Sequence, residues 1–254
     1  MTLGGARTIG AVSAELWCVG LGLVPYRTAR EAQRRLEAAR QEGGVPDLLL
    51  LLEHPPVYTR GRRSQPAELP MGEDWYRMQG IEVCETDRGG RVTYHGPGQL
   101  VGYPIVDLSA YGDDVHAYVR RLEQVMISAL GHHGVEARTI EDLTGVWTAG
   151  RRKIGAIGIH VSRGVTTHGF AINVSNDLQP FEWIVPCGLE GCRVSSLTAE
   201  LGERQDLDRL ARTVTAEFGR VYERQPLALS PEDLVERVPA LAELGLGATV
   251  AATA

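Results

Sequence analysis

Residues 153–174 read KIGAIGIHVSRGVTTHGFAINV, and this stretch decides the fold. Two runs rich in β-branched residues, 153–161 and 165–174, flank the short segment Ser162–Gly164. Two such runs with a glycine-containing connection of this length predict an antiparallel β-hairpin. Strands rather than helices are therefore expected in this part of the chain.

Six further strand-like runs precede the hairpin. The clearest is DLLLLLE at 47–53, an apolar run typical of a buried strand, which His54-Pro55-Pro56 brings to an end. Two short runs flank a turn at Gly89–Gly90. The remaining runs have the β-branched and aromatic content of strands. In chain order the six are 15–24, 47–53, 81–86, 91–94, 99–108 and 144–150.

Helical segments occur between and after these strands at irregular intervals. The longest, DDVHAYVRRLEQVMISALGHHG at 113–134, has apolar residues at the helical period, with Asp113 as its expected N-cap. Others are expected at 27–40, at 206–222, and after Ser230 and Pro231. Strands without regular β-α-β alternation predict an α+β fold with mixed, largely antiparallel sheets and flanking helices.

Composition is that of a globular protein, with 43% hydrophobic and 23% charged residues. We expect one domain over 15–244, with flexible tails at 1–14 and 245–254, because no repeat or long linker divides the chain. No apolar run has the roughly 20 residues that span a bilayer, and no signal peptide is evident, so a cytoplasmic protein without membrane contact is expected. The net charge of −6 argues against nucleic-acid binding.

Lysine usage singles out one residue. Of the 26 basic residues, 25 are arginine and one is lysine, Lys153. Arginine stays charged in proteins, whereas lysine can lose its proton when it is buried or lies near other cations. A chain that uses arginine for every other positive charge either keeps this lysine for proton transfer or retains it by chance, and composition alone does not separate the two.

Four cysteines, at 18, 84, 187 and 192, form no CxxC pair and no disulfide framework. Cys18 and Cys84 lie within strand-like runs and are expected to be small buried residues. Cys187 lies between Pro186 and Gly188 in IVPCGLEGCRVSSL at 184–197, where a tight turn would present its thiol. A nucleophilic cysteine needs a base or a cation nearby. Cys192 is either a second thiol or a bystander.

Seven histidines are further candidate bases. His116, His132 and His133 belong to the long helix or its end and are expected at the surface or as caps; His54, His95, His160 and His168 lie at strand ends or beside glycines, where they can line a cleft. A zinc site from Cys187, Cys192 and a histidine has poor ligand spacing. No GxSxG motif supports a serine hydrolase.

A glycine-rich segment, DRGGRVTYHGPGQLVGYP at 87–104, carries the densest group of polar residues. Glycines let a backbone approach a ligand and direct N–H groups at its oxygens. The same pattern also occurs in ordinary turns. The segment lacks the spacing of either common phosphate-binding loop.

Taken together, five ordered segments resemble the lipoyl(octanoyl) transferases from about Leu16 to about Tyr222. The segments are EHPPVYTRG at 53–61, TDRGGRVTYHGPGQLVGYP at 86–104, TGVW at 144–147, RKIGAIGIHVSRGVTTHGFAINV at 152–174 and PFEWIVPCGLEGCRVSSL at 180–197. Cys192 and both tails lie outside the pattern.

The resemblance implies the fold of biotin and lipoate protein ligases, which is also that of class II aminoacyl-tRNA synthetases. It implies an acyltransferase of lipoate biosynthesis that carries octanoyl, or lipoyl, from acyl carrier protein to a lysine. Lipoyl domains of 2-oxoacid dehydrogenase complexes and the glycine cleavage H protein would be the acceptors, with no cofactor and no metal. The family's catalytic residues fall on Cys187 and Lys153. Its substrate-binding residues fall on Arg88, Gly89, Gly90, Arg91, Val92, Thr93, Tyr94, His95, Ala156, Ile157, Gly158, Gly169, Phe170 and Ala171.

The residues fit this chemistry. A thioester donor is already activated, so transfer to Cys187 and onward needs proximity and a proton carrier rather than ATP. Arg151 and Arg152 precede Lys153, and nearby cations favour a neutral lysine. A basic rim is expected to guide acidic partners, formed by Arg60, Arg62, Arg63, Arg88, Arg91, Arg151 and Arg152. Two alternatives are an ATP-dependent lipoate ligase on the same fold and a non-catalytic protein that binds acylated carriers.

Overall fold

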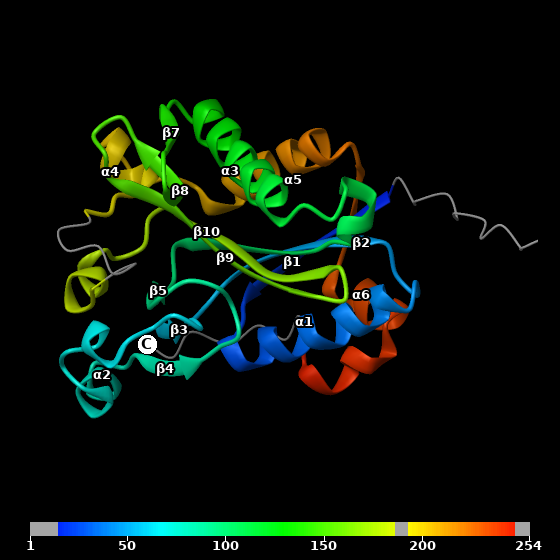
Figure 1. Cartoon of the computed structure of the whole chain (residues 1–254), viewed down its shortest axis with the longest axis horizontal. Helices are drawn as coiled ribbons and strands as arrows, with labels where there is room; N and C mark the ends of the chain where they lie inside the picture. Colours follow the sequence, from blue (N-terminus) through cyan, green and yellow to red (C-terminus); the bar gives the residue numbers. More distant parts are fainter. Residues whose placement is uncertain (1–14, 186–192, 247–254) are drawn as a thin grey trace, which may run out of the picture.

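The computed structural model describes residues 15–185 and 193–246 (Figure 1). Within them, the main element is an eight-stranded mixed sheet in the order β11-β1-β2-β6-β10-β9-β8-β7. β1 pairs in parallel with β2 and β11, and every other pairing in this sheet is antiparallel. The strands are β1 Glu15–Leu23, β2 Asp47–Glu53, β6 Gln99–Ile105, β7 Ala137–Ile140, β8 Leu143–Thr148, β9 Lys153–Ser162, β10 Val165–Asn173 and β11 Gln225–Leu229.

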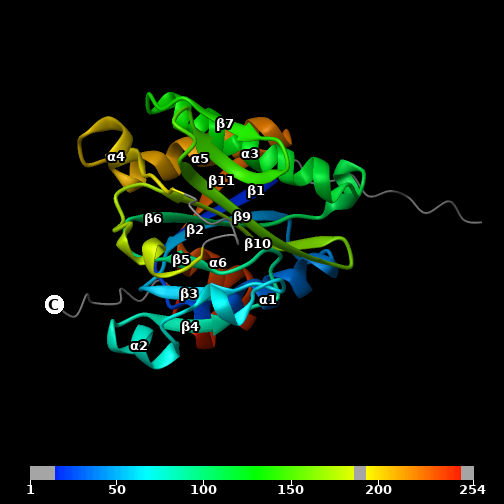
Figure 2. The same ribbon diagram turned by 60° about the vertical axis from the view of Figure 1, so that its left-hand side comes forward.

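A small three-stranded sheet lies below the large sheet, beside α1 (Figure 2). Its middle strand is β3 (Val57–Arg60), which pairs in parallel with β4 (Glu82–Glu85) and antiparallel with β5 (Thr93–His95). The short helix α2 (Glu73–Met78) packs on its outer side. A cluster of tyrosines, including Tyr58, Tyr76 and Tyr94, forms the core of this part of the molecule. The small sheet therefore supplies a second wall that faces β9 and β10.

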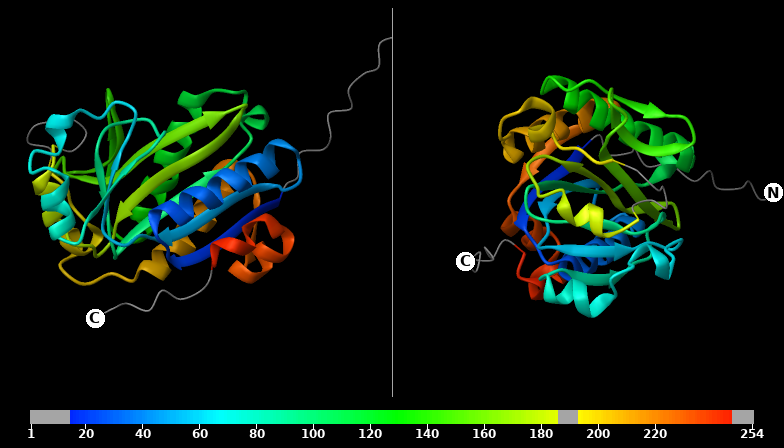
Figure 3. Two further views of the ribbon diagram at one scale, coloured as in Figure 1. Left: turned by 90° about the horizontal axis from the view of Figure 1, so that it is seen from below. Right: turned by 90° about the vertical axis from the view of Figure 1, so that its left-hand side faces the viewer.

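Helices cover both faces of the large sheet (Figures 1 and 3). On one face α3 (Val115–His132) and α5 (Leu207–Tyr222) pack through residues such as Leu122 and Phe218. On the other, α1 (Tyr26–Gln41), α6 (Pro231–Arg237) and the 3₁₀ segment Pro239–Leu244 pack through residues such as Leu36 and Leu241. β2 lies between these layers, which explains why its five central residues, 48–52, are all leucine.

Most predicted elements are confirmed. β9 and β10 form the predicted hairpin, with Ser162 paired with Val165. Ser230 caps α6 in a capping box with Asp233, and Pro231 is the first helical residue.

The predicted N-cap of α3, Asp113, is wrong by one residue. The side chain of Asp114 accepts the hydrogen bonds from the backbone N–H groups of the first turn. Asp113 precedes it with a φ of 55°, the left-handed region that aspartate tolerates.

Sequence patterns missed five short strands and α-helices: β3, β7, β11, α2 and α4 (Leu197–Leu201). β11 is an exposed edge strand, so it has no apolar run to mark it. β3 follows two prolines and has only four residues, and it separates β4 from β5, which therefore do not form a hairpin with each other. Such strands are fixed by their partners rather than by their own pattern.

Candidate active site

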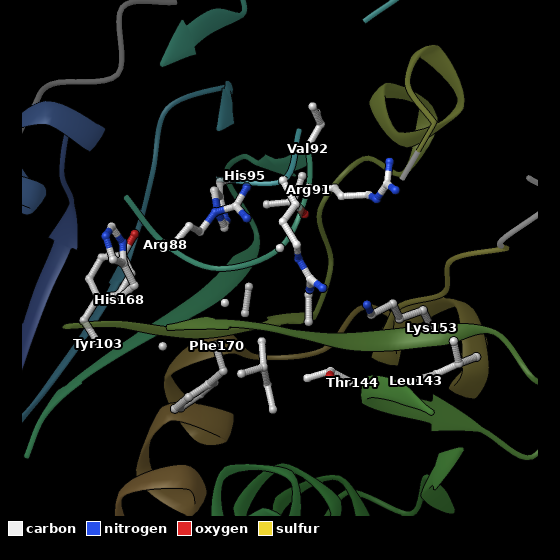
Figure 4. Close-up of a pocket in the computed structure, with 18 of the residues that line it drawn as sticks. Arg88, Arg91, Val92, His95, Tyr103, Leu143, Thr144, Lys153, His168 and Phe170 are labelled. Carbon is white, nitrogen blue, oxygen red and sulfur yellow. The ribbon is translucent and has the colours of Figure 1, made fainter. Parts of the chain in front are cut away.

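A cavity of about 320 Å³ lies between the β9–β10 hairpin and the loop that leads into β5 (Figure 4). Its lining is exposed at one end, where Arg63, Asp142 and Thr144 lie, and buried at the other. The buried end consists of rings: Tyr26, His95, Tyr103 and His168, each at most 7% exposed. Lys153 and His168 lie toward opposite ends of this cavity (Figure 4). The site is thus a tunnel-like space with an open mouth and a closed base.

The structure brings the predicted residues together around this cavity. Lys153 and twelve of the fourteen predicted substrate-binding residues line it, from Arg88 through His95 and from both hairpin strands. The two exceptions are Gly89 and Tyr94. The Gly89 N–H donates to the Ile159 carbonyl, and Tyr94 is buried in the core of the small sheet. Cys187 and Cys192 lie outside the described residues.

Lys153 is the first residue of β9 and is only 8% exposed. Its Nζ lies 5.5 Å from the centre of the Trp147 ring, on the neighbouring strand β8. Gly145, also on β8, makes room for it, because a Cβ there would lie 2.8 Å from Lys153 Cε and 2.6 Å from the Gly155 carbonyl oxygen. Gly145 and Trp147 of the TGVW motif therefore form the surface against which the Lys153 side chain packs.

The chain that follows the undescribed segment 186–192 is tied directly to Lys153. The Lys153 N–H donates to the Arg193 carbonyl at 2.8 Å, and the Ser195 N–H donates to the Lys153 carbonyl at 2.9 Å. Arg152 forms a bidentate ion pair with Glu200, which also accepts a hydrogen bond from the Ser195 hydroxyl. These contacts hold residues 193–200 against the start of β9.

The chain that precedes the same segment is tied to the small sheet. The Val185 N–H donates to the Glu68 carbonyl, and the Tyr76 hydroxyl donates to the Trp183 carbonyl. The buried carboxylate of Glu68 in turn accepts hydrogen bonds from Arg91 and from the Val92 N–H, both of which line the cavity. Both described flanks of residues 186–192 are thus anchored to the walls of the cavity.

The Arg152–Glu200 pair provides a first prediction. In Glu200→Gln the ion pair is lost, and we expect kcat/KM for the acyl transfer that the resemblance implies to fall by about tenfold, with a loss of about 1 kcal/mol in the free energy of unfolding. Steady-state kinetics and urea denaturation measure the two effects. Glu203→Gln, an exposed carboxylate in the same region, is the control. Equal kinetics of the two variants would contradict an anchoring role for Glu200.

The loop ahead of β5 is shaped by Arg88, which is buried. Its guanidinium donates to the Thr59 carbonyl at 2.6 Å and to the Thr59 hydroxyl at 2.7 and 3.1 Å. Gly61 and Gly158 leave room for it, since a Cβ on either would lie within about 3 Å of the arginine side chain. Arg88 thus acts within the wall rather than as part of an exposed rim.

Three histidines near the base of the cavity are buried. The Val24 carbonyl can only accept, so His54 donates from Nδ1 and receives the Tyr103 hydroxyl at Nε2. Burial lowers the pKa of His54 to about 4 and that of His95 to about 3. Burial also lowers the pKa of His168, while its hydrogen bond holds the pKa of Asp87 well below its usual range. These imidazoles are therefore neutral at pH 7.

The predicted basic rim is largely paired. Arg60 forms ion pairs with Glu73 and Glu85, and Arg91 forms one with Glu68. Arg62 and Arg63 are exposed at the end of β3, and their backbone N–H groups donate to the carbonyls of Arg88 and Gly90. The rim predicted from sequence is thus wrong for Arg88, which is buried, whereas Arg60, Arg91 and Arg152 are partly exposed and paired with carboxylates.

The other candidate residues fall as follows. Cys18 and Cys84 are buried as expected, and burial raises the pKa of each thiol to about 12. His160 does not line the cavity, whereas His95 and His168 do. Sequence reasoning missed Tyr26, which comes from the start of α1, and Asp142 and Leu143, which come from the turn into β8. The only sequence signal near Asp142 and Leu143 is the TGVW motif that follows them, and no pattern marked Tyr26.

The catalytic domain model of the lipoyl protein ligase A/B family matches residues 25–219. The chain belongs to this family. A curated member from Solibacter usitatus, an octanoyltransferase, is 52% identical over 207 residues, which cover 82% of this chain and 93% of that protein. The resemblance noted from the sequence is therefore confirmed.

Solved structures of family members and their neighbours have the same fold. A putative lipoate protein ligase from T. acidophilum with bound lipoic acid superposes with a TM-score of 0.71 and 19% identity, over 91% of this chain and 94% of that one. The biotin protein ligase of Aquifex aeolicus, in complex with biotin and ATP, gives a TM-score of 0.50 and 14% identity, over 82% and 70%. The predicted fold class is confirmed. In the described part of this chain, no helix is long and apolar enough to cross a membrane.

Proposed function

We propose that this protein is a lipoyl(octanoyl) transferase that moves an octanoyl group from acyl carrier protein to a lysine of a lipoyl domain. The observation that carries the proposal is the position of Lys153. The one lysine of the chain lies in the wall of the cavity. Its backbone is hydrogen-bonded to Arg193 and Ser195, which follow Cys187 in the chain. The 52% identity to an octanoyltransferase over most of both chains supports the same reaction.

The proposed reaction has two transfers. In the first, Lys153 takes the Cys187 proton, the thiolate attacks the thioester carbonyl, and the carrier thiol leaves with a proton. In the second, the acceptor lysine amine attacks the acyl-cysteine, Lys153 takes a proton from that amine, and the Cys187 thiol is restored. Each step exchanges one bond to the acyl carbon, so no other reactant is needed.

The walls of the cavity fit an acyl group. Ala156, Gly158, Gly169 and Ala171 line the cavity with small residues, and Ile157 and Phe170 beside them pack toward the core, where the Phe170 ring lies directly over Gly102. Gly155, by contrast, serves strand packing, since a Cβ there would press on Met126 and Val146 of the core. Arg63 lines the cavity and Arg62 precedes it, and both exposed side chains can meet an acidic carrier or lipoyl domain.

The test is intact-protein mass spectrometry after mixing with octanoyl-acyl carrier protein in the absence of ATP. We expect an octanoyl adduct on the wild type and on Cys192→Ser, and none on Cys187→Ser. Adding a lipoyl domain should remove the adduct and acylate the domain. An ATP requirement would instead support the ligase, and full function of Cys187→Ser would support a binding protein.

A further inference from the structure

We propose that His168 sets the upper limit of acyl-chain length, because it forms a partition between two cavities; the inference rests on the proposed function. A second cavity of about 300 Å³ lies on the α1 side of the hairpin, lined by Arg27, Arg30, Glu31, Gln33, Arg34, Glu37, Asp87, Thr167 and His168. Of the described residues, His168 alone lines both cavities. Its side chain therefore separates the buried base of the first cavity from the second.

His168 is held in this place from several sides. Its Nε2 donates to the Asp87 carboxylate at 2.9 Å, and its backbone N–H donates to the Gln33 side chain of α1 at 2.6 Å. Its ring packs edge-on against Tyr103, with centroids 6.3 Å apart. Asp87 is itself 3.4 Å from the Arg30 guanidinium. The ring is thus fixed by contacts from α1, β6 and the loop before β5.

The backbone of His168 is strained. Its φ is 57°, in the left-handed region that glycine adopts readily and histidine rarely adopts within a strand. Strain of this kind persists only where the surrounding structure imposes it. A glycine at this position would relieve the strain and remove the partition at the same time.

The geometry of the hairpin sets the length scale. His168 pairs with Ile159, which lies six residues along β9 from Lys153, or about 20 Å at the rise of a strand. With carbon–carbon bonds of about 1.5 Å, an extended eight-carbon chain spans roughly 9 Å and a sixteen-carbon chain roughly 19 Å. An octanoyl group held near Lys153 therefore fits within the cavity, whereas a hexadecanoyl group reaches the His168 ring.

The second cavity is lined mainly by charged side chains, so it does not attract an alkyl tail. It only provides space into which a longer tail can pass once the ring is absent. His168 thus limits the length of the acyl chain because its ring blocks the way into the second cavity. Removal of the ring should therefore increase transfer of long acyl chains, with little change in the affinity for short ones.

The test compares transfer from octanoyl- and hexadecanoyl-acyl carrier protein by wild type, His168→Gly and His168→Asn. We expect the hexadecanoyl to octanoyl ratio of kcat/KM to rise at least about tenfold in His168→Gly, and less in His168→Asn, which keeps a smaller side chain. His160→Gly, on the paired strand outside the cavity, should keep the wild-type ratio.

A second readout is independent of turnover. Calorimetric binding of hexadecanoate relative to octanoate should rise in the same order across the variants. An unchanged ratio in folded His168→Gly would overturn the partition. Failure of the wild type to transfer octanoyl would instead overturn the proposed function, and the binding series would still decide the role of His168.

Discussion

Lys153→Arg is expected to lower the rate of octanoyl transfer by a factor of about 10² to 10⁴, the usual contribution of a general base. Arginine keeps the charge but does not release a proton at neutral pH, so it can hold a thiolate without accepting the thiol or amine proton. The fold should survive, because the bonds from position 153 to Arg193 and Ser195 involve only the backbone. Steady-state transfer assays measure the rate, and urea denaturation measures the stability of the fold.

Two companion variants sharpen this experiment. Lys153→Ala empties the space above Gly145, and small primary amines added to the buffer should restore part of its activity. Arg138→Lys, on the edge strand β7, exchanges the same two side chains at an exposed position and should behave as wild type. Near-normal turnover by Lys153→Arg would show that proton transfer does not pass through this residue.

Arg88→Met is expected to cost about 2–4 kcal/mol of folding free energy and to lower kcat/KM by a factor of about 100. The guanidinium bonds to the Thr59 carbonyl and hydroxyl, and Thr59 is completely buried, so removal leaves its polar atoms unpaired. The cavity-lining residues Gly90 to Thr93 follow Arg88 directly and should lose their position with it.

Thermal or urea denaturation and steady-state kinetics measure these effects. Arg88→Lys should recover little, because an ammonium cannot reproduce the planar, forked donor set. Arg77→Met is the matched control: Arg77 is exposed and pairs with Asp74 within one turn of α2, so its loss should change stability by at most about 0.5 kcal/mol. A similar loss in both variants would mean that burial of Arg88 is unimportant.

Local patterns were sufficient for the elements with a strong period of their own. DLLLLLE at 47–53, the hairpin from Lys153 to Asn173 and the amphipathic helices carry their burial in their composition, so their positions follow from the sequence. The edge strands β7 and β11 carry no such pattern, because most of their residues are exposed or only partly buried. The partner of β11 is also remote in sequence, since β11 pairs with β1 at the start of the chain.

The sequence by itself determined the family, and it predicted the residues that carry the chemistry. The single lysine, the glycine-rich segment and the hairpin motif all point to residues that line one cavity. They are far apart in the chain, however, so their convergence around that cavity could not be derived from spacing.

Only the tertiary structure decided what each side chain contacts. Arg88 reads as a surface charge in the sequence, yet it is buried in the wall because Gly61 and Gly158 leave space for it. His168 reads as one of four cleft histidines, yet it separates two cavities because α1, β6 and the loop before β5 meet at that point. Such roles depend on contacts between segments remote in sequence, and no local pattern encodes them.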